Sequence, residues 1–162
     1  MPFLRSLIVA SALTLLPVAA LAQGAKIAFG NVQQDTSQPV EVTADNLDVN
    51  QNDGTAIFTG NVLIGQGEMR LSAPKVRIYY NEDGDRIEKM KASGGVTLVS
   101  GDDAAEAAEA EYNIDAGLIL MRGNVLLVQK KSALTAERMN IDIKSGTARM
   151  EGRVKTVLPG NE

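Results

Sequence analysis

Apolar and polar residues alternate along most of the chain, which is the period-2 pattern of half-buried β-strands. The alternation is clear at 47–49 and at 139–143. A short polar turn that contains glycine follows each such segment, as at Ser145-Gly146, and a second alternating segment comes after the turn. Glycine can adopt the positive φ that short hairpin turns require. The pattern therefore predicts a series of β-hairpins.

The hairpin pattern recurs four times. Residues 42–62 and 134–154 align without a gap, 105–125 form a third copy, and 71–96 form a fourth copy with about five extra residues near its turn. The copies begin 29, 34 and 29 residues apart, at Ala44, Ala73, Ala107 and Ala136. A unit of this size cannot bury its apolar face alone, so we expect the units to share one core.

A glycine recurs where the second strand of each unit ends, as in the Gly-Asn-Val of 60–62 and 123–125. Glycine within a strand pattern marks a bulge or a bend. A closed barrel, a β-solenoid and two sheets folded over one another are all compatible with the repeats. The regular bends favour two folded-over antiparallel sheets.

One segment conflicts with this interpretation. Residues 103–111 (DAAEAAEAE) are strong helix formers, and in isolation they predict a helix. The repeat register instead places 107–114 on a strand. Because tertiary context routinely overrides propensity, we follow the register and expect a strand.

The N-terminal 22 residues have the features of a secretory signal peptide. Arg5 precedes a short apolar run at 7–16, and Ala20-Leu21-Ala22 provides small residues for cleavage between Ala22 and Gln23. The run is short for a transmembrane helix, and without cysteine the chain cannot be a lipoprotein. We therefore expect a signal peptide at 1–22, an N-terminal lead-in at 23–34, one β-domain at 35–159 and a short tail at 160–162.

The amino-acid composition excludes several classes of catalytic and binding site. The chain has no cysteine, histidine or tryptophan, which excludes cysteine nucleophiles, histidine-dependent triads and the common zinc and haem sites. The formal charge is −4, or −5 once Arg5 is removed, so there is no basic footprint for nucleic acid. The carboxylates fall mostly in turns and on outward strand positions. We therefore predict a protein that is not an enzyme and needs no metal or cofactor.

Three stretches carry a resemblance to a known family. Residues 35–42 (DTSQPVEV), 58–62 with 73–76 (FTGNV and APKV) and 154–159 (VKTVLP) resemble the first strand, the first repeat boundary and the closing strand of the LptA/OstA-like family, the periplasmic lipopolysaccharide-transport bridge. The resemblance implies a V-shaped β-jelly roll with a hydrophobic interior. It also implies that copies stack head to tail between an inner-membrane complex and an outer-membrane translocon.

A lipopolysaccharide carrier needs an apolar path, because each exposed methylene of an acyl chain costs about 0.8 kcal/mol. The inward strand positions could line this path, although each could equally fill an ordinary core. They are Val49, Phe58, Val62, Ile64, Leu71, Val76, Ile78, Leu98, Tyr112, Ile114, Met121, Val125, Leu127, Met139, Ile141 and Met150.

The first and last strands are candidate docking edges, since an open sheet leaves unpaired backbone groups that another chain can use. The predicted edge residues are Val40, Glu41, Val42, Val154, Lys155, Thr156, Val157 and Leu158.

Two other functions are compatible with the sequence. One is an adaptor that binds protein edges without lipid, and the other is a secreted carbohydrate-binding β-protein. The latter would need an exposed aromatic stripe, which three Tyr, three Phe and no Trp hardly provide.

Overall fold

The computed structural model describes residues 25–30 and 36–158, and within them the chain is all-β. Eleven strands form one antiparallel sheet, which confirms the predicted fold class. Their bounds are β1 (Ala25–Ala28), β2 (Glu41–Thr43), β3 (Asn46–Asn50), β4 (Thr55–Gln66), β5 (Met69–Tyr80), β6 (Ile87–Ser100), β7 (Asp103–Asn113), β8 (Leu118–Gln129), β9 (Ser132–Asp142), β10 (Thr147–Glu151) and β11 (Lys155–Val157).

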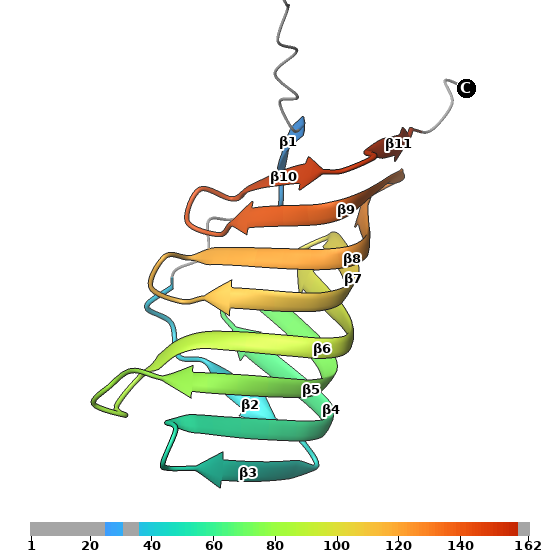
Figure 1. Ribbon diagram of the computed structural model, residues 1–162. Coiled ribbons are helices and arrows are strands. Elements are labelled where there is room, and N and C mark those ends of the chain that lie inside the picture. Colours follow the sequence, from blue (N-terminus) through green and yellow to red (C-terminus); the bar gives the residue numbers. More distant parts are fainter. Residues whose placement is uncertain (1–24, 31–35, 159–162) are drawn as a thin grey trace, which may run out of the picture.

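The strands from β4 to β10 pair in sequence order, each with the next, so that the sheet grows along one axis (Figure 1). At one end, β2 and β3 both pair with β4, in line with each other. At the other end, β10 and β11 both pair with β9 in the same way. The long strands β4 to β9 therefore connect two ends that are each built from two short strands.

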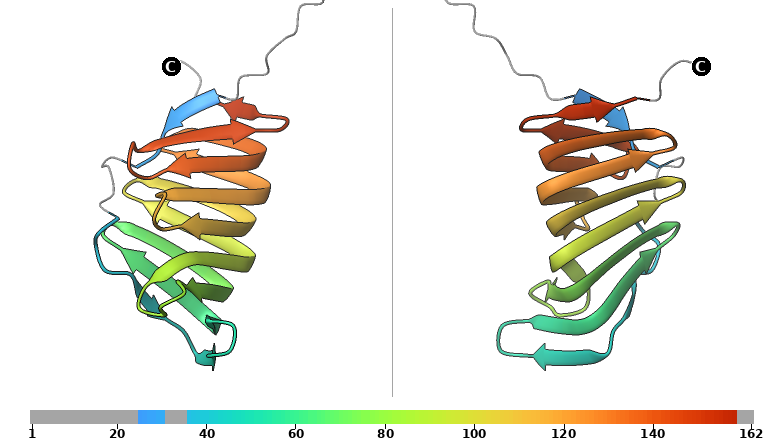
Figure 2. Two further views of the ribbon diagram at one scale, coloured as in Figure 1. Left: turned by 60° about the vertical axis from the view of Figure 1, so that its left-hand side comes forward. Right: turned by 90° about the vertical axis from the view of Figure 1, so that its right-hand side faces the viewer.

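Every long strand bends near its middle, so the single sheet folds over into two facing arms (Figure 2). The pairing register shifts along this line, for example between Thr59 and Val62 and between Arg122 and Val125. The first arm contains β3, β10, β1 and the strand segments 55–59, 75–80, 87–93, 109–113, 118–122 and 138–142. The second arm contains β2, β11 and the segments 62–66, 69–73, 96–100, 103–107, 125–129 and 132–136.

The predicted bend glycines lie on this line and explain it. Gly123 has φ 84° and Asn124 has φ 48°, in the left-handed region that favours glycine. A Cβ built on Gly123 would lie 2.7 Å from the Cβ of Ala108 on the neighbouring strand. Glycine is therefore required here both by the backbone conformation and by the close approach of β7.

The segment with conflicting signals, 103–111, is strand, as the register predicts. Ala105 and Ala107 are buried between the arms, whereas Glu106 is exposed on the outer face. Strands β6 and β8 lie on either side and provide backbone partners on both sides of the bend at Ala108. This pairing outweighs the helix propensity of alanine and glutamate.

The N-terminal lead-in differs from the prediction. It contains a strand, β1, that pairs with β10 at the opposite end of the sheet from β2. The expected first strand, around 40–42, is therefore the second one. The proposed signal peptide and its cleavage site between Ala22 and Gln23 lie outside the described residues. Over the described ranges, no helix is long and apolar enough to cross a membrane.

Candidate functional site

The facing surfaces of the two arms form continuous apolar ladders. In the second arm, the residues opposite one another on successive strands from β4 to β9 are Ile64, Leu71, Leu98, Ala105, Leu127 and Leu134. In the first arm, the corresponding ladder from β4 to β10 is Ala56, Ile78, Met90, Tyr112, Ile119, Ile141 and Ala148. At about 4.8 Å per strand, the first-arm face from β3 to β1 spans roughly 38 Å.

The predicted lining residues lie almost entirely on these faces. Their side chains come from both arms and meet in one core. The buried ones are Val62, Ile64, Leu71, Val76, Ile78, Leu98, Tyr112, Met121, Val125, Leu127, Met139, Ile141 and Met150. Phe58 and Ile114 are partly buried against the same core. In this structure the space between the arms is therefore occupied by side chains.

Val49 is placed differently from the rest. The register pairs it with buried Ala56, so it belongs to the inward face, yet it is 62 % exposed. Leu47, two residues earlier on the same strand, is 53 % exposed. Both lie on β3, the last strand at that end of the sheet, and no other strand of the described residues covers them. Val49 therefore lies on the predicted inward face but is exposed at the end of the sheet in this single chain.

Several interior residues were not predicted. Met69, Met90, Val96 and Ile119 are buried on the same faces. The alternation that identified their neighbours extends to them, so a longer pattern search would have found them. Phe29, which follows β1, is also buried, and no local pattern indicates it.

A buried polar contact joins the two arms where their tips approach each other. The hydroxyl of Tyr112, in the first arm, donates to Oε1 of Gln66 in the second arm at 2.7 Å. Each of the two residues is only 2 % exposed. Burial raises the pKa of Tyr112 to about 12, because the charged phenolate would lose its hydration.

Two described parts of the N-terminal segment contact the tips of the arms. The backbone N–H of Phe29 donates to the carbonyl of Gly146 in the first arm, and that of Gly30 donates to Oδ2 of Asp103 in the second arm. Farther along, Nε2 of Gln66 donates to the carbonyls of Thr36 (3.1 Å) and Gln38 (3.0 Å). Backbone contacts at both described parts of this segment thus hold it against the open side of the roll.

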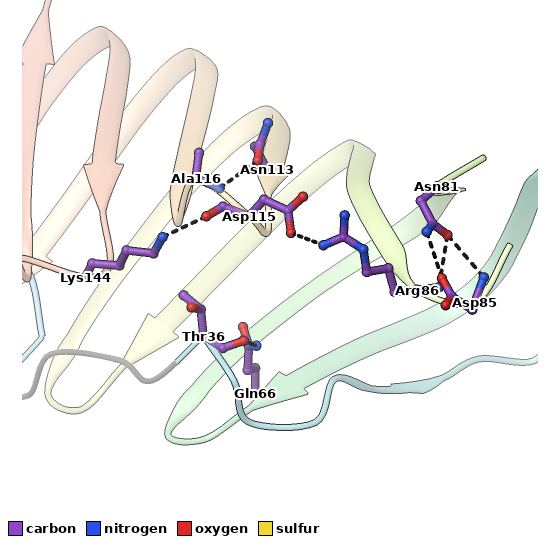
Figure 3. A network of polar contacts seen from close by, with 9 residues as sticks. All are labelled: Thr36, Gln66, Asn81, Asp85, Arg86, Asn113, Asp115, Ala116 and Lys144. Atoms are coloured by element: carbon purple, nitrogen blue, oxygen red, sulfur yellow. Dashed lines mark hydrogen bonds and ion pairs between the residues drawn. The ribbon is translucent and has the colours of Figure 1, made fainter. Parts of the chain in front are cut away.

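A polar network links the turns at the tip of the first arm (Figure 3). Arg86 forms an ion pair with Asp115 at 2.7 Å, and Nζ of Lys144 donates to the carbonyl of Asp115 at 2.7 Å. These residues come from three successive turns. The apolar interior is therefore bordered by a charged, hydrated rim on this side.

The acidic residues of the turns stabilise those turns. Asp142 accepts hydrogen bonds from the backbone N–H groups of Lys144 and Ser145. The bond from the Ser145 backbone is the main reason that the pKa of Asp142 is lowered. Among the described residues, no group of acidic side chains is placed to hold a metal ion. The arrangement can exclude water and hold apolar groups between the two arms.

The fold and its interior define a class, a folded-over antiparallel β-roll with apolar inner faces and a polar rim. Residues 41–147 match the model of the LptA/(LptD N-terminal domain) LPS transport protein family. The chain belongs to this family. The resemblance noted from the sequence is thereby confirmed.

Individual proteins are also similar to this chain in sequence or in fold. An uncharacterised protein of Rhizobium meliloti (strain 1021) is 28 % identical over 156 residues, covering 90 % of this chain and 84 % of the relative. The lipopolysaccharide export system protein LptA of Haemophilus influenzae is 27 % identical, covering 78 % of this chain and 80 % of the relative. The crystal structure of LptH, the LptA homologous periplasmic component of the lipopolysaccharide transport device of Pseudomonas aeruginosa, matches with a TM-score of 0.70 at 16 % identity, covering 78 % of this chain and 99 % of LptH.

Proposed function

We propose that this protein carries lipopolysaccharide by holding its acyl chains between the two arms of the roll. The observation that carries the proposal is the pair of apolar ladders, which cross the sheet from strand to strand without a break. An acyl chain of about 12 methylenes would cost on the order of 10 kcal/mol to expose to water. A path through an aqueous compartment must therefore be apolar along its whole length.

Because side chains fill the interior, lipid entry requires the arms to separate. The tips of the arms are joined by few polar contacts, of which the hydrogen bond from Tyr112 to Gln66 is buried. The interior includes Met121, Met139 and Met150, whose flexible thioether side chains adapt to different packing partners. Opening at the tips would expose this adaptable surface to acyl chains, while the charged rim faces the sugars and phosphates of the lipid.

The family relationship supports a periplasmic location for this transport. LptH is a periplasmic component of a lipopolysaccharide transport device, and the LptA relatives are lipopolysaccharide export proteins. We therefore place this chain in the periplasm, processed after Ala22, between an inner-membrane complex and an outer-membrane translocon. Copies would stack head to tail, with the β2 and β3 end of one copy meeting the β10 and β11 end of the next.

Site-specific photo-crosslinking tests the lipid path. A photoreactive residue is introduced at inward Met121 or Met139, or at the outward positions Arg122 or Arg138 beside them as matched controls. The purified protein is then incubated with lipopolysaccharide and illuminated. We expect lipid adducts from the inward positions only, since neighbouring strand residues point to opposite faces.

Two results would contradict the proposal. Adducts that form equally at inward and outward positions would show surface adsorption, and a folded protein that forms no adduct and does not co-elute with lipopolysaccharide would favour the adaptor function. Circular dichroism of each variant establishes that it is folded before the adducts are compared.

A further inference from the structure

The strand β1 covers a sheet edge that the sequence does not predict to be covered. It pairs with β10 from Ala25 opposite Met150 to Ala28 opposite Thr147. Nε2 of Gln129 also donates to the carbonyl of Ala28 at 2.7 Å. In contrast, the outer edges of β2, β3 and β11 have no strand partner among the described residues. One of the four outer edges is therefore occupied by the chain's own N-terminal segment (Figure 1).

The strand β3, at the far end of the same arm, matches β1 in direction and pattern. All pairings from β3 through β4 to β10 and β1 are antiparallel, so β1 and β3 run the same way. In β1, Ile27 is opposite buried Ala148, and in β3, Val49 is opposite buried Ala56. Each strand thus presents apolar residues at alternate positions to the inner face. A second copy that continued the first arm would place its β3 where β1 lies.

The charge of β3 suits the same position. If β3 of a second copy took the register of β1, with Val49 opposite Ala148, Asp48 would lie opposite Arg149. An opposite-charge pair at this position is stabilising. The edge of β10 is therefore well matched to β3 of another copy.

Docking would also cover the apolar residues left exposed at the β3 end. Leu47 and Val49 are on the inward face, and no strand of the described residues lies beyond them. In the register above they would lie opposite Met150 and Ala148 of the next copy. The second arm would continue in the same manner, because β2 and β11 run in opposite directions and their outer edges have no strand partner among the described residues.

We propose that β1 is an internal substitute for β3 of a second copy, and that its release from β10 controls head-to-tail assembly. The proposal rests on the head-to-tail stacking of the proposed function. While β1 is bound, the first-arm edge is closed to other chains and the protein is protected from uncontrolled growth. When a second copy docks, its β3 replaces β1 and extends the apolar face.

A reversible covalent lock tests this device in the processed protein. Ala28→Cys with Thr147→Cys places two cysteines at paired, exposed positions of β1 and β10, in a chain without other cysteines. We expect the oxidised protein to self-associate at least tenfold more weakly than the reduced protein, as measured by light scattering. Lys91→Cys with Glu111→Cys, a paired position of β6 and β7, is the control and should associate equally in both states.

One single substitution tests the charge argument and does not depend on oxidation. Asp48→Lys would place two basic residues opposite each other in the proposed contact and should weaken self-association severalfold. Glu106→Lys makes the same change of net charge on the outer face of β7 and should have no such effect.

A release variant completes the test. Ile27→Asp disfavours the inward position of residue 27 and should strengthen association relative to the unsubstituted protein. If the released protein stays monomeric, or if the oxidised lock associates as well as the reduced protein, the proposal is overturned. Lipopolysaccharide co-elution is measured on the same samples. Loss of lipid binding in every sample would count against the proposed function, whereas normal lipid binding with unregulated assembly would count only against the role of β1.

Discussion

Replacement of Tyr112 with phenylalanine should destabilise the roll by about 2 kcal/mol. The change removes the hydroxyl that donates to Oε1 of Gln66 and leaves the ring in place. Gln66 is buried, so its carbonyl oxygen would lose its partner and gain no water in exchange. A buried acceptor left without a donor costs roughly 1–3 kcal/mol. Since this bond joins the two arms, the variant should also bind lipopolysaccharide faster.

Tyr112 also leads to a prediction for the stability of the folded protein above pH 10. The pKa of Tyr112 is about 12 in the folded protein, against 10.0 for an ordinary tyrosine. The unfolded chain therefore loses this proton first. The contribution of the protonated Tyr112 hydroxyl to the free energy of unfolding is fully present below pH 10 and is lost as the pH rises to 12. At about 1.4 kcal/mol per pKa unit, the loss approaches roughly 3 kcal/mol. The stability difference between the wild type and Tyr112→Phe should thus disappear across this range.

Urea unfolding at pH 8 and at several values between pH 10 and pH 12 measures both effects. Tyr79→Phe is the matched control, because Tyr79 is a partly exposed tyrosine whose ring lies 4.8 Å from Nζ of Lys89. Its replacement keeps that ring and should change the free energy of unfolding by less than about 0.5 kcal/mol. The reasoning is refuted if Tyr112→Phe unfolds like the control at pH 8, or if its stability difference from the wild type stays constant up to pH 12.

Three further outcomes follow from the fold. Gly123→Ala should lower the free energy of unfolding by about 1–3 kcal/mol in urea titrations, because the new Cβ would clash with that of Ala108 and residue 123 has a positive φ. Wild-type stability of this variant would contradict the argument that the bend requires glycine. Deletion of residues 156–162 removes most of β11 and should abolish concentration-dependent growth in light scattering while lipid co-elution persists; continued growth would show that the second-arm edge is not used. N-terminal sequencing of the secreted protein should begin at Gln23, and recovery with Met1 in the membrane fraction would contradict a soluble carrier.

The hairpins and bends could be predicted because their causes are local. Alternation at 139–143 sets which side chains face inward, and β9 has that pattern along its length. Glycine at 123 marks a conformation that few other residues adopt, and the register shifts there. Even 103–111, where local propensity favours a helix, could be assigned correctly from the spacing of its neighbours.

The candidate site was less predictable, because alternation identifies a face and does not show what covers it. Ile141 and Val49 occupy the same position in their repeats. Ile141 lies on β9, between β8 and β10, and is fully buried, whereas Val49 lies on the last strand and is mostly exposed. The difference comes from the order of strands in the sheet, which is a property of the whole fold.

The strand β1 was missed for a related reason. Its four residues, Ala25–Ala28, are too few to establish a period, and its partner β10 is more than 100 residues away in the sequence. Only the backbone edge that β10 presents makes these residues a strand. The predicted edge at 154–158 is longer than β11, which contains three residues, whereas β2 is as long as the predicted edge at 40–42 and lies one residue later. The first-arm edges, β3 and β1, were not among the predicted ones.

The two ends of the roll explain why such a covering strand is useful. A carrier that extends by stacking needs free strand edges and exposed apolar residues at its ends, which are the features that also cause uncontrolled aggregation. Here Leu47 and Val49 at one end and Val157 and Leu158 at the other are exposed. Complementary ends of this kind do not close on themselves, so their contacts extend without limit. In the proposed assembly, a short strand over one edge resolves the conflict, because it blocks chance contacts and is replaced by β3 of another copy.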